Sequence, residues 1–564
     1  MYNLQATTYK LQAALSAAST SSKLNGVGNR SPLPQENQRN IVEPQSTVNS
    51  ISTPFFGVPG CPSLLELIWL PINDSSSRPS CFCDQDDEAF DADGSSVSVV
   101  CLNLTDLAPL RNAVQAIQSV GKRLFSLTIN GSQLEDGTFV GGFFKSLNVT
   151  PVRFAIKLCF DEDGNANRTL NLGRDFFTTA QIDVLKSFVI SDCTLSDISE
   201  IPDQVKRLVH LEQLHLNRVG LKGLKNDDLD GLDRLQILDL NDNDIAYIPR
   251  RLFEKSKNLR VINLGSNWVN ETSLRAFSNR LSRLTILDLS DNNISALTPK
   301  SFEKQTHLET LILSQNFLRR ISRNTFLSLN HLQHVFLDKN LIQGANAIPF
   351  ALPSSIRTLD LGKNFIANFP DFSKANLPNL TLLSLNDNEL TTIPTGRLDK
   401  LYNLATLYLG ANQKLSSIGK KAFYDLHNLR DLDLSYANLS EFDSKSYFGV
   451  DSHLINLWLP RTNLGDHLAP TSFSALPNLR NLDLYGASIT SIRAGVLDPL
   501  KKLTSINLAG NDFVCDKKRI NYLAKWLKKN VDNSQRALQF RVGQVPVCAD
   551  PAELMGLPLY SLSE

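Results

Sequence analysis

No stretch of the sequence is apolar over the 18 or so residues that a membrane-spanning helix needs. Neither charge is in excess, since Lys+Arg and Asp+Glu number 57 each, and this balance gives no support to a nucleic-acid partner. The chain also lacks a phosphate-binding loop, a Gly-x-Ser-x-Gly elbow and a His-Glu-x-x-His zinc motif. We therefore expect no membrane span, no nucleic-acid ligand, no cofactor and no enzymatic activity.

What the sequence does contain is one phrase that returns every 24 or 25 residues from Leu211 onward. It reads leucine, two variable residues, leucine, one variable residue, leucine, two variable residues, asparagine, one variable residue, leucine. The clearest example is Leu235, Leu238, Leu240, Asn243 and Ile245. The register is kept by phrases that open at Leu211, Leu235, Leu259, Leu284, Leu308, Leu332, Ile356, Leu380, Leu404, Leu429, Leu454, Leu479 and Leu503. Such self-similarity predicts a solenoid of stacked repeats.

The phrase predicts one short strand per repeat. Counted from the opening leucine, positions 1, 4 and 6 point inward, whereas positions 2, 3, 5, 7 and 8 point largely outward. A single repeat cannot bury its apolar side, so the repeats must share one continuous core. The asparagine at position 9 can both donate and accept, and we expect it to bind the backbone groups left free where each strand turns away. The rest of each period, such as Leu318–Leu329, returns the chain along the other side.

This pattern resembles the leucine-rich repeat family, in its 24-residue class typical of extracellular proteins. The resemblance implies an α/β solenoid, a horseshoe with a parallel concave β-sheet, a mostly irregular or short-helical convex side, and disulfide caps. Its match is strong over 185–513 and weak over 120–184. The expected parts are a disordered leader over 1–55, a cysteine cap over 56–120, repeats over 121–513 that are irregular before 211, and a C-terminal cap over 514–564.

Eight cysteines lie mostly at the two ends of the array, where an unfinished core needs a cap. Small caps favour disulfides, and no paired Cys-x-x-Cys ligands support a zinc site instead. The group Cys61-Pro62, Cys81-Phe-Cys83 and Cys101 is similar to the cap that opens many secreted members of the family. The usual pairing there implies Cys61–Cys83 and Cys81–Cys101, although the sequence alone permits three connectivities.

The C-terminal cap departs from the family pattern at one cysteine. Lys517 stands where the pattern has its second cysteine, and no fourth cysteine follows, so the resemblance implies Cys515–Cys548 as the remaining bond. Cys193, at position 9 of an earlier phrase, is either a reduced core residue or a partner of Cys159. The basic helix expected at 517–529 offers a polyanion contact, with a merely solvated face as the alternative.

The cysteine caps predict an oxidising compartment, and hence a secreted, extracellular glycoprotein. No charged segment followed by an apolar stretch opens the chain, so we expect a secretory leader to be missing from this sequence. The alternatives are unconventional export and an intracellular protein with reduced cysteines. Six sequons in the repeats are glycosylation candidates: Asn130, Asn148, Asn270, Asn293, Asn379 and Asn438.

Two sets of outward residues are candidates for function. Aspartates at position 5 form a column, Asp239, Asp288, Asp360, Asp433 and Asp483, but Leu-Asp-Leu is common in this family and a structural role is the stronger interpretation. Aromatics break the phrase where its asparagine gives way to Ala437, Thr462 and Ala487. We expect a concave aromatic strip that binds a partner, made of Phe336, Tyr408, Tyr436, Trp458, Arg461 and Tyr485.

The sequence thus predicts a protein–protein recognition module that acts through its concave face. One alternative is a non-catalytic accessory subunit of a secreted enzyme. The cysteine spacing of the N-terminal cap with Leu127-Thr-Ile129-x-x-Ser132 looks like an arthropod branch of the family, which includes the non-catalytic subunit of a shrimp luciferase (a luciferin monooxygenase). The other alternative is a truncated receptor or cell-adhesion ectodomain.

Overall fold

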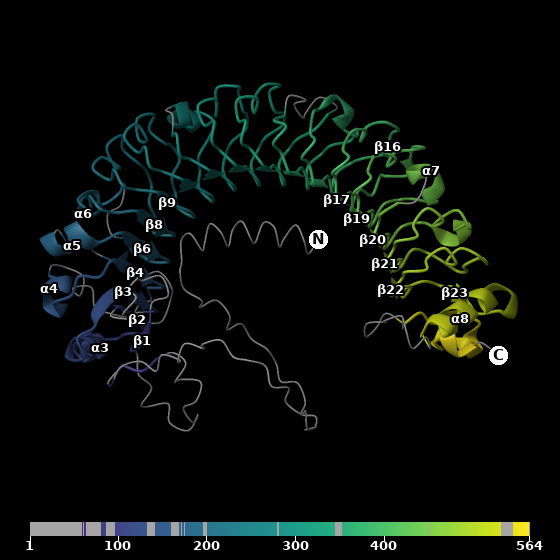
Figure 1. Cartoon of the computed structure of the whole chain (residues 1–564), viewed down its shortest axis with the longest axis horizontal. Coiled ribbons are helices and arrows are strands. Elements are labelled where there is room, and N and C mark those ends of the chain that lie inside the picture. Colours follow the sequence, from purple (N-terminus) through teal and green to yellow (C-terminus); the bar gives the residue numbers. More distant parts are fainter. Residues whose placement is uncertain are drawn as a thin grey trace, which may run out of the picture. The chain divides into compact units, whose positions relative to one another are not determined.

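The computed structural model describes residues 59, 61–63, 81–85, 96–131, 142–159, 169–170, 172–173, 175–195, 200–278, 281–344, 352–449, 452–531 and 545–562. The leader expected over 1–55 lies outside these residues. The chain divides into two compact units. Unit 1 comprises Met1–Lys222 with Asp228–Asn243, and unit 2 comprises Gly223–Asp227 with Asp244–Glu564. Figure 1 labels some of the elements of each unit.

Unit 1 is built on a sheet that opens with one antiparallel pair and continues in parallel. Strands β1 and β2 are antiparallel, and β2, β3, β4, β6, β8 and β9 follow as parallel neighbours in that order. Its sheet strands are β1 Cys81–Gln85, β2 Ser96–Leu102, β3 Arg123–Asn130, β4 Arg153–Lys157, β6 Ser187–Ser191, β8 Gln213–Asn217 and β9 Ile237–Asp239. The connections contain α3 Ala108–Ser119, α4 Phe143–Leu147, β5 Thr169–Leu170, α5 Thr179–Val184, β7 Thr194–Leu195 and α6 Asp203–Lys206.

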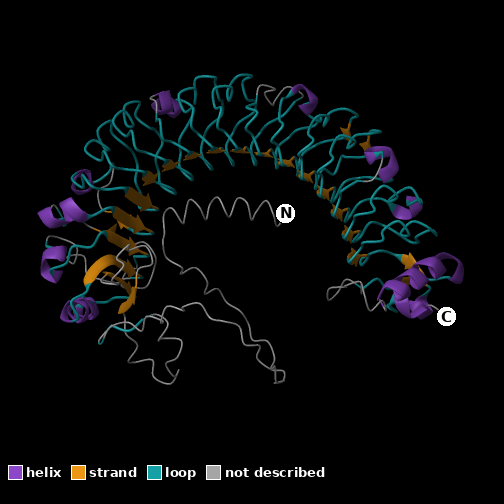
Figure 2. Cartoon of the chain, viewed as in Figure 1, coloured by secondary structure: helices purple, strands orange, loops and turns teal. Residues whose placement is uncertain are grey.

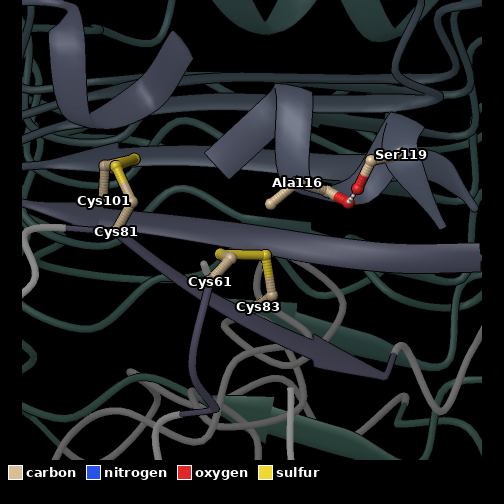
Figure 3. The surroundings of a disulfide bond; sticks show 6 residues. All are labelled: Cys61, Cys81, Cys83, Cys101, Ala116 and Ser119. Carbon is tan, nitrogen blue, oxygen red and sulfur yellow. Dashed lines mark hydrogen bonds between the residues drawn. A yellow bond between two sulfur atoms is a disulfide. The ribbon is translucent and has the colours of Figure 1, made fainter. Parts of the chain in front are cut away.

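Two disulfides close the first edge of this sheet. Cys81 and Cys101 are register partners across β1 and β2 and are bonded to each other, and Cys61 is bonded to Cys83 (Figure 3). These are the pairs that the resemblance implied. All four cysteines are buried, and the apolar face of α3, which includes Leu110, is buried as well. The cap therefore covers an edge of the core with side chains fixed by covalent bonds.

Phenylalanine replaces leucine at core positions of two early repeats in unit 1. Phe154 of β4 and Phe188 of β6 occupy the register position that Leu127 and Leu214 hold in β3 and β8. Their rings lie 6.1 Å apart and are nearly parallel. Phe143, Phe144, Phe176 and Phe177 complete the cluster. Between these strands Cys159 is bonded to Cys193, which decides between the two alternatives left open for Cys193.

Unit 2 has the same kind of architecture, and in its described residues the main sheet has eleven short strands, one from each regular phrase. All neighbours in its main sheet pair in parallel with aligned register. These strands are β10 Val261–Asn263, β11 Ile286–Asp288, β12 Thr310–Ile312, β13 His334–Phe336, β14 Thr358–Asp360, β15 Leu382–Ser384, β17 Thr406–Tyr408, β19 Asp431–Asp433, β20 Asn456–Trp458, β21 Asn481–Asp483 and β22 Ser505–Asn507. Within this unit the strands follow the inner side of the curve and the connections the outer side (Figure 2). The predicted solenoid with a parallel sheet is confirmed.

A ladder of buried asparagines ties successive repeats of unit 2 together, as the phrase predicts. Asn340 is representative: its Nδ2 donates to the carbonyl of Leu313 in the preceding repeat at 2.9 Å and to Leu337 of its own repeat at 3.1 Å. Its Oδ1 accepts the amide of Leu318 at 3.0 Å. One side chain thus satisfies backbone groups that the turn at the end of each strand leaves without a partner.

The outer side of unit 2 is mostly irregular, with short elements between the strands. They are η1 Ser273–Ser278, η2 Phe372–Lys374, β16 Thr392–Ile393, β18 Ser417–Ile418, α7 Ser444–Phe448 and η3 Gly465–His467. The unit ends in β23 Phe513–Val514, α8 Lys517–Val531, β24 Cys548–Asp550, η4 Ala552–Leu554 and η5 Leu559–Leu562. Cys515 is bonded to Cys548, and Leu523 and Leu527 of α8 are fully buried. None of the helices in the described residues is long and apolar enough to span a membrane.

Candidate recognition surface on strands β17 to β22

The six residues of the expected aromatic strip do not form one surface. Phe336 in β13 and Tyr408 in β17 are buried, with 1% and 2% of their surface exposed. The prediction that these two rings face a partner is therefore wrong. Tyr436, Arg461 and Tyr485 are exposed, and Trp458 is half-buried.

Burial at position 5 follows from the spacing of the sheet. Phe336 has Ile312 and Asp360 as register partners on its two sides, and Tyr408 has Ser384 and Asp433. Adjacent strands lie about 4.8 Å apart, so side chains on both neighbouring strands can cover a ring that points away from the core, as they do for Phe336 and Tyr408 but only in part for Trp458. Outward direction alone does not make a side chain accessible.

The three exposed residues form a compact stack. The guanidinium carbon of Arg461 lies 5.6 Å from the ring centroid of Tyr436 and 5.8 Å from that of Tyr485. Both distances are within the range of a cation–π contact. The arginine therefore lies between two tyrosines from the repeats on either side of its own, and we call these residues the Tyr–Arg–Tyr stack.

Backbone geometry holds the stack in place. Tyr436 and Arg461 both occupy position 8, where the backbone is left-handed with φ of 58° and 54°. The amide of Tyr436 donates to Pro460 at 2.8 Å, and that of Arg461 donates to Tyr485 at 2.7 Å. Gly510 lies against the Tyr485 ring, since a Cβ at this position would come within 2.8 Å of it. The glycine therefore makes room for the outermost ring of the stack.

A row of hydrogen-bonded polar side chains runs beside the stack at position 3. Thr406 donates to Asp431 at 3.1 Å, Asn456 donates to the other oxygen of Asp431, and Asn481 donates to Asn456. Between this row and the stack lies Trp458, whose register partners are Asp433 and Asp483. Sequence reasoning missed the polar row, although comparison of position 3 between the aligned phrases would have shown it.

The position-5 aspartates have a common structural role. Each accepts a hydrogen bond from the backbone amide two residues further on. The distances are 3.3 Å for Asp239, 2.8 Å for Asp288, 2.9 Å for Asp360, 2.8 Å for Asp433 and 2.9 Å for Asp483. The carboxylates thus hold the turn that leaves each strand, in agreement with the structural interpretation of this column.

One of these aspartates makes stability depend on pH. Burial raises the pKa of Asp360 to about 7, and the charge of Asp338 adds to this shift. Because the folded pKa exceeds the unfolded value of about 3.9, the folded state binds more protons between these values, and stability falls as pH rises from about 4 to about 7. Asp360→Asn should therefore raise the urea midpoint at pH 8 and change it little at pH 4. Equal shifts at both pH values would contradict this assignment.

The remaining predicted sites lie apart from the stack. Among the sequons, Asn148, Asn379 and Asn438 are exposed and Asn130, Asn270 and Asn293 are half-buried. On α8, Lys525, Lys528 and Lys529 are exposed, and Arg519 pairs with Asp516 at 3.3 Å. The glycosylation sites and the polyanion contact remain predictions.

Comparison with known proteins supports a leucine-rich repeat fold. The leucine rich repeat family model matches residues 282–342, 354–413, 402–457 and 452–513. No curated protein matches the chain. A solved structure of TLR13 with ssRNA13 is similar with a TM-score of 0.54 at 20% identity, over 81% of this chain and 79% of that one.

Two further solved structures share the fold. A leucine-rich repeat protein of Leptospira interrogans matches with a TM-score of 0.52 at 20% identity, over 75% of this chain and 91% of that one. A chain of the glycosylated Drosophila Toll–Spatzle complex matches with a TM-score of 0.51 at 17% identity, over 86% of this chain and 75% of that one. Together with the repeated phrase, the parallel sheet and the asparagine ladder, these matches show that the chain contains leucine-rich repeats and has the leucine-rich repeat solenoid fold.

Proposed function

We propose that this protein recognises a protein partner outside the cell through the inner face of strands β17 to β22. The observation that carries the proposal is the Tyr–Arg–Tyr stack beside the half-buried Trp458. Tyrosine, tryptophan and arginine are the residues most enriched at binding hot spots. Stacking fixes the three side chains before a ligand arrives, and such preorganisation lowers the entropy cost of binding.

The charges of this face favour a protein over a nucleic acid. Arg430, Arg461 and Arg480 are exposed on it, whereas Asp431, Asp433 and Asp483 lie half-buried between them. Nucleic-acid binding depends on an excess of basic side chains that displaces counterions from phosphates, and here the two signs alternate. The similar structures were solved with ligands of both kinds, an RNA for TLR13 and Spatzle for Toll. Whether the partner of this chain is a protein or a nucleic acid therefore tests the proposal directly.

The disulfides support the extracellular part of the proposal. Four buried bonds, Cys61–Cys83, Cys81–Cys101, Cys159–Cys193 and Cys515–Cys548, fix both caps and one early repeat. Disulfides of this kind persist in oxidising compartments. The role of a non-catalytic subunit or of a receptor ectodomain would use the same surface, and the identity of the captured partner distinguishes them.

Alanine variants of the stack test the proposal. The full chain and its Arg461→Ala and Tyr485→Ala variants are immobilised and incubated with extracellular fluid of the source organism, and the retained proteins are quantified by mass spectrometry. We expect one set of proteins to bind the unmodified chain, and each variant to lose at least ten-fold in retention, because both side chains are exposed hot-spot candidates.

Tyr424→Ala is the matched control, because Tyr424 has the same 45% exposure as Tyr436 and contacts Lys421 at 5.3 Å, but lies outside the proposed surface. It should retain the proteins in full. Equal losses in the control and the stack variants, or retention of nucleic acid in place of protein, would contradict the proposal.

A further inference from the structure

A row of exposed apolar side chains runs along one flank of unit 2, at position 10 of successive phrases. The phrase leaves this position variable, so the pattern of leucines did not reveal it. Trp268, Phe317 and Phe365 are exposed by 57%, 51% and 48%, and Leu341 is half-buried. We call these residues, together with Asn293, the flank row.

The backbone aligns the flank row from one repeat to the next. The position-10 amide of each repeat donates to the position-11 carbonyl of the repeat before it. Trp268 donates to Ile245, Asn293 to Val269, Phe317 to Ile294, Leu341 to Leu318 and Phe365 to Ile342, at 2.9 to 3.0 Å. The five side chains therefore lie side by side at the repeat spacing and form one continuous strip rather than scattered exposed residues.

Large and small side chains alternate along this strip. The order is Trp268, Asn293, Phe317, Leu341, Phe365 and then Glu389, so a bulky ring is followed by a smaller or flexible side chain at every step. If the same strip of a second copy runs antiparallel to this one and is displaced by one repeat, each large side chain lies opposite a smaller or more flexible one. Contiguous exposed apolar surface of this kind marks an interaction site.

We infer that the flank row pairs with the flank row of a second copy of this chain about a two-fold axis between Phe317 and Leu341. Such an isologous contact places Phe317 against Leu341 of the other copy, and Phe365 against Asn293. Trp268, whose indole N–H donates to Asp244 of its own chain at 3.4 Å, then lies against Glu389, which pairs with Lys414 at 3.1 Å. Every ring faces a smaller or flexible side chain, and the six positions span ~24 Å at the strand spacing.

The charges next to the flank row independently favour the same axis. Position 8 lies beside position 10 and carries Asp291, Gln315, Lys339 and Lys363 in successive repeats, all exposed. A two-fold axis between Phe317 and Leu341 places Asp291 of each copy opposite Lys363 of the other copy. It also places Gln315 of each copy opposite Lys339 of the other. Asp291 is already oriented, since it accepts hydrogen bonds from Gln315 at 2.7 Å and from Ser266 at 3.2 Å. Opposite charges in register add specificity to such a contact.

Glycosylation of the sequon at Asn293 would control whether two copies can pair. Asn293 faces Phe365 of the second copy, so a glycan on Asn293 would fill the space that this ring needs. Pairing therefore requires an unmodified Asn293, and the glycosylated chain should be monomeric. The inference does not depend on the proposed function, because the stack and the flank row share no residue.

Sedimentation equilibrium of the full chain, produced without glycosylation and with its disulfides formed, tests the pairing. We expect a monomer–dimer equilibrium with a micromolar Kd, as suits a small interface. Phe317→Asp should weaken it at least ten-fold. Leu327→Asp, an apolar residue with 56% exposure outside the flank row, should leave it unchanged. A chain that stays monomeric at 100-fold the expected Kd, about 100 μM, or equal effects of the two variants, would overturn the inference.

Charge reversal tests the axis itself. In a dimer of the Asp291→Lys variant, positions 291 and 363 both carry lysine and repel each other at both symmetric contacts. In a dimer of the Lys363→Asp variant, both positions carry aspartate and repel each other in the same way. Each variant should therefore associate at least ten-fold more weakly than the unmodified chain. An equimolar mixture of the two variants restores both pairs and should form a heterodimer. A mixture that associates no better than the separate variants would overturn the axis. Full glycan occupancy at Asn293 in the secreted chain would overturn pairing for that form.

Discussion

Replacing Asn364 with alanine is expected to lower the free energy of unfolding by about 4 kcal/mol, because each buried polar group left without a partner costs about 1–3 kcal/mol. The Asn364 side chain donates to the carbonyls of Leu337 and Leu361, each at 3.0 Å, and of Gly362 at 3.1 Å. It also accepts the amide of Ile342 at 3.0 Å. Urea unfolding followed by circular dichroism measures the loss, and faster hydrogen exchange at the Ile342 amide locates it.

Thr462→Ala is the control for this prediction. Thr462 holds the same position 9 two repeats before the end of the ladder, but its hydroxyl makes a single bond, to Leu459 at 2.8 Å. Its loss should cost about 1 kcal/mol, the usual net value of one hydrogen bond. If Asn364→Ala costs no more than Thr462→Ala, the ladder does not contribute to stability as its geometry indicates.

The asparagine ladder was predictable because its cause is local. A buried amide at a fixed distance from each strand end has one set of partners, the backbone groups of the turn, whatever the neighbouring repeats contain. The parallel sheet follows from the same phrase, since leucines at fixed positions must share one core. These parts of the fold depend on residues within one repeat and its neighbour, so the sequence determines them without a structure.

The accessibility of the outward aromatics was not predictable in the same way. Phe336, Tyr408 and Trp458 all occupy position 5, yet the first two are buried and the third is half-buried. All three rings have non-aromatic register partners on both sides, so neither the position in the phrase nor the register predicts how exposed each ring is. Arg461 was predicted beside the aromatics, but its place between Tyr436 and Tyr485 depends on the left-handed backbone at position 8.

Two further features, the phenylalanine cluster and the flank row, were not predicted from the leucine phrase. In the phenylalanine cluster of unit 1, Phe188 fits the phrase that opens at Leu185, whereas Phe154 lies in a stretch where the sequence gives no clear phrase. The flank row lies at a position that the phrase does not specify. A comparison of position 10 between the aligned phrases would have shown the flank row, whereas the ring contacts of the phenylalanine cluster are visible only in the structure.

Phe336→Ala is expected to destabilise the protein by about 3–5 kcal/mol, the cost of removing a fully buried aromatic ring. Phe336 is 1% exposed and lies between Ile312 and Asp360 on the inner face of the sheet, so its ring is enclosed although it points away from the core. Phe317→Ala is the matched control: the substitution is the same and lies in the preceding repeat, but the ring is 51% exposed. It should change stability by less than about 0.5 kcal/mol, measured by urea unfolding at concentrations well below the dimer Kd. Similar losses for the two variants would mean that Phe336 is not enclosed by its neighbours and is free to contact a partner.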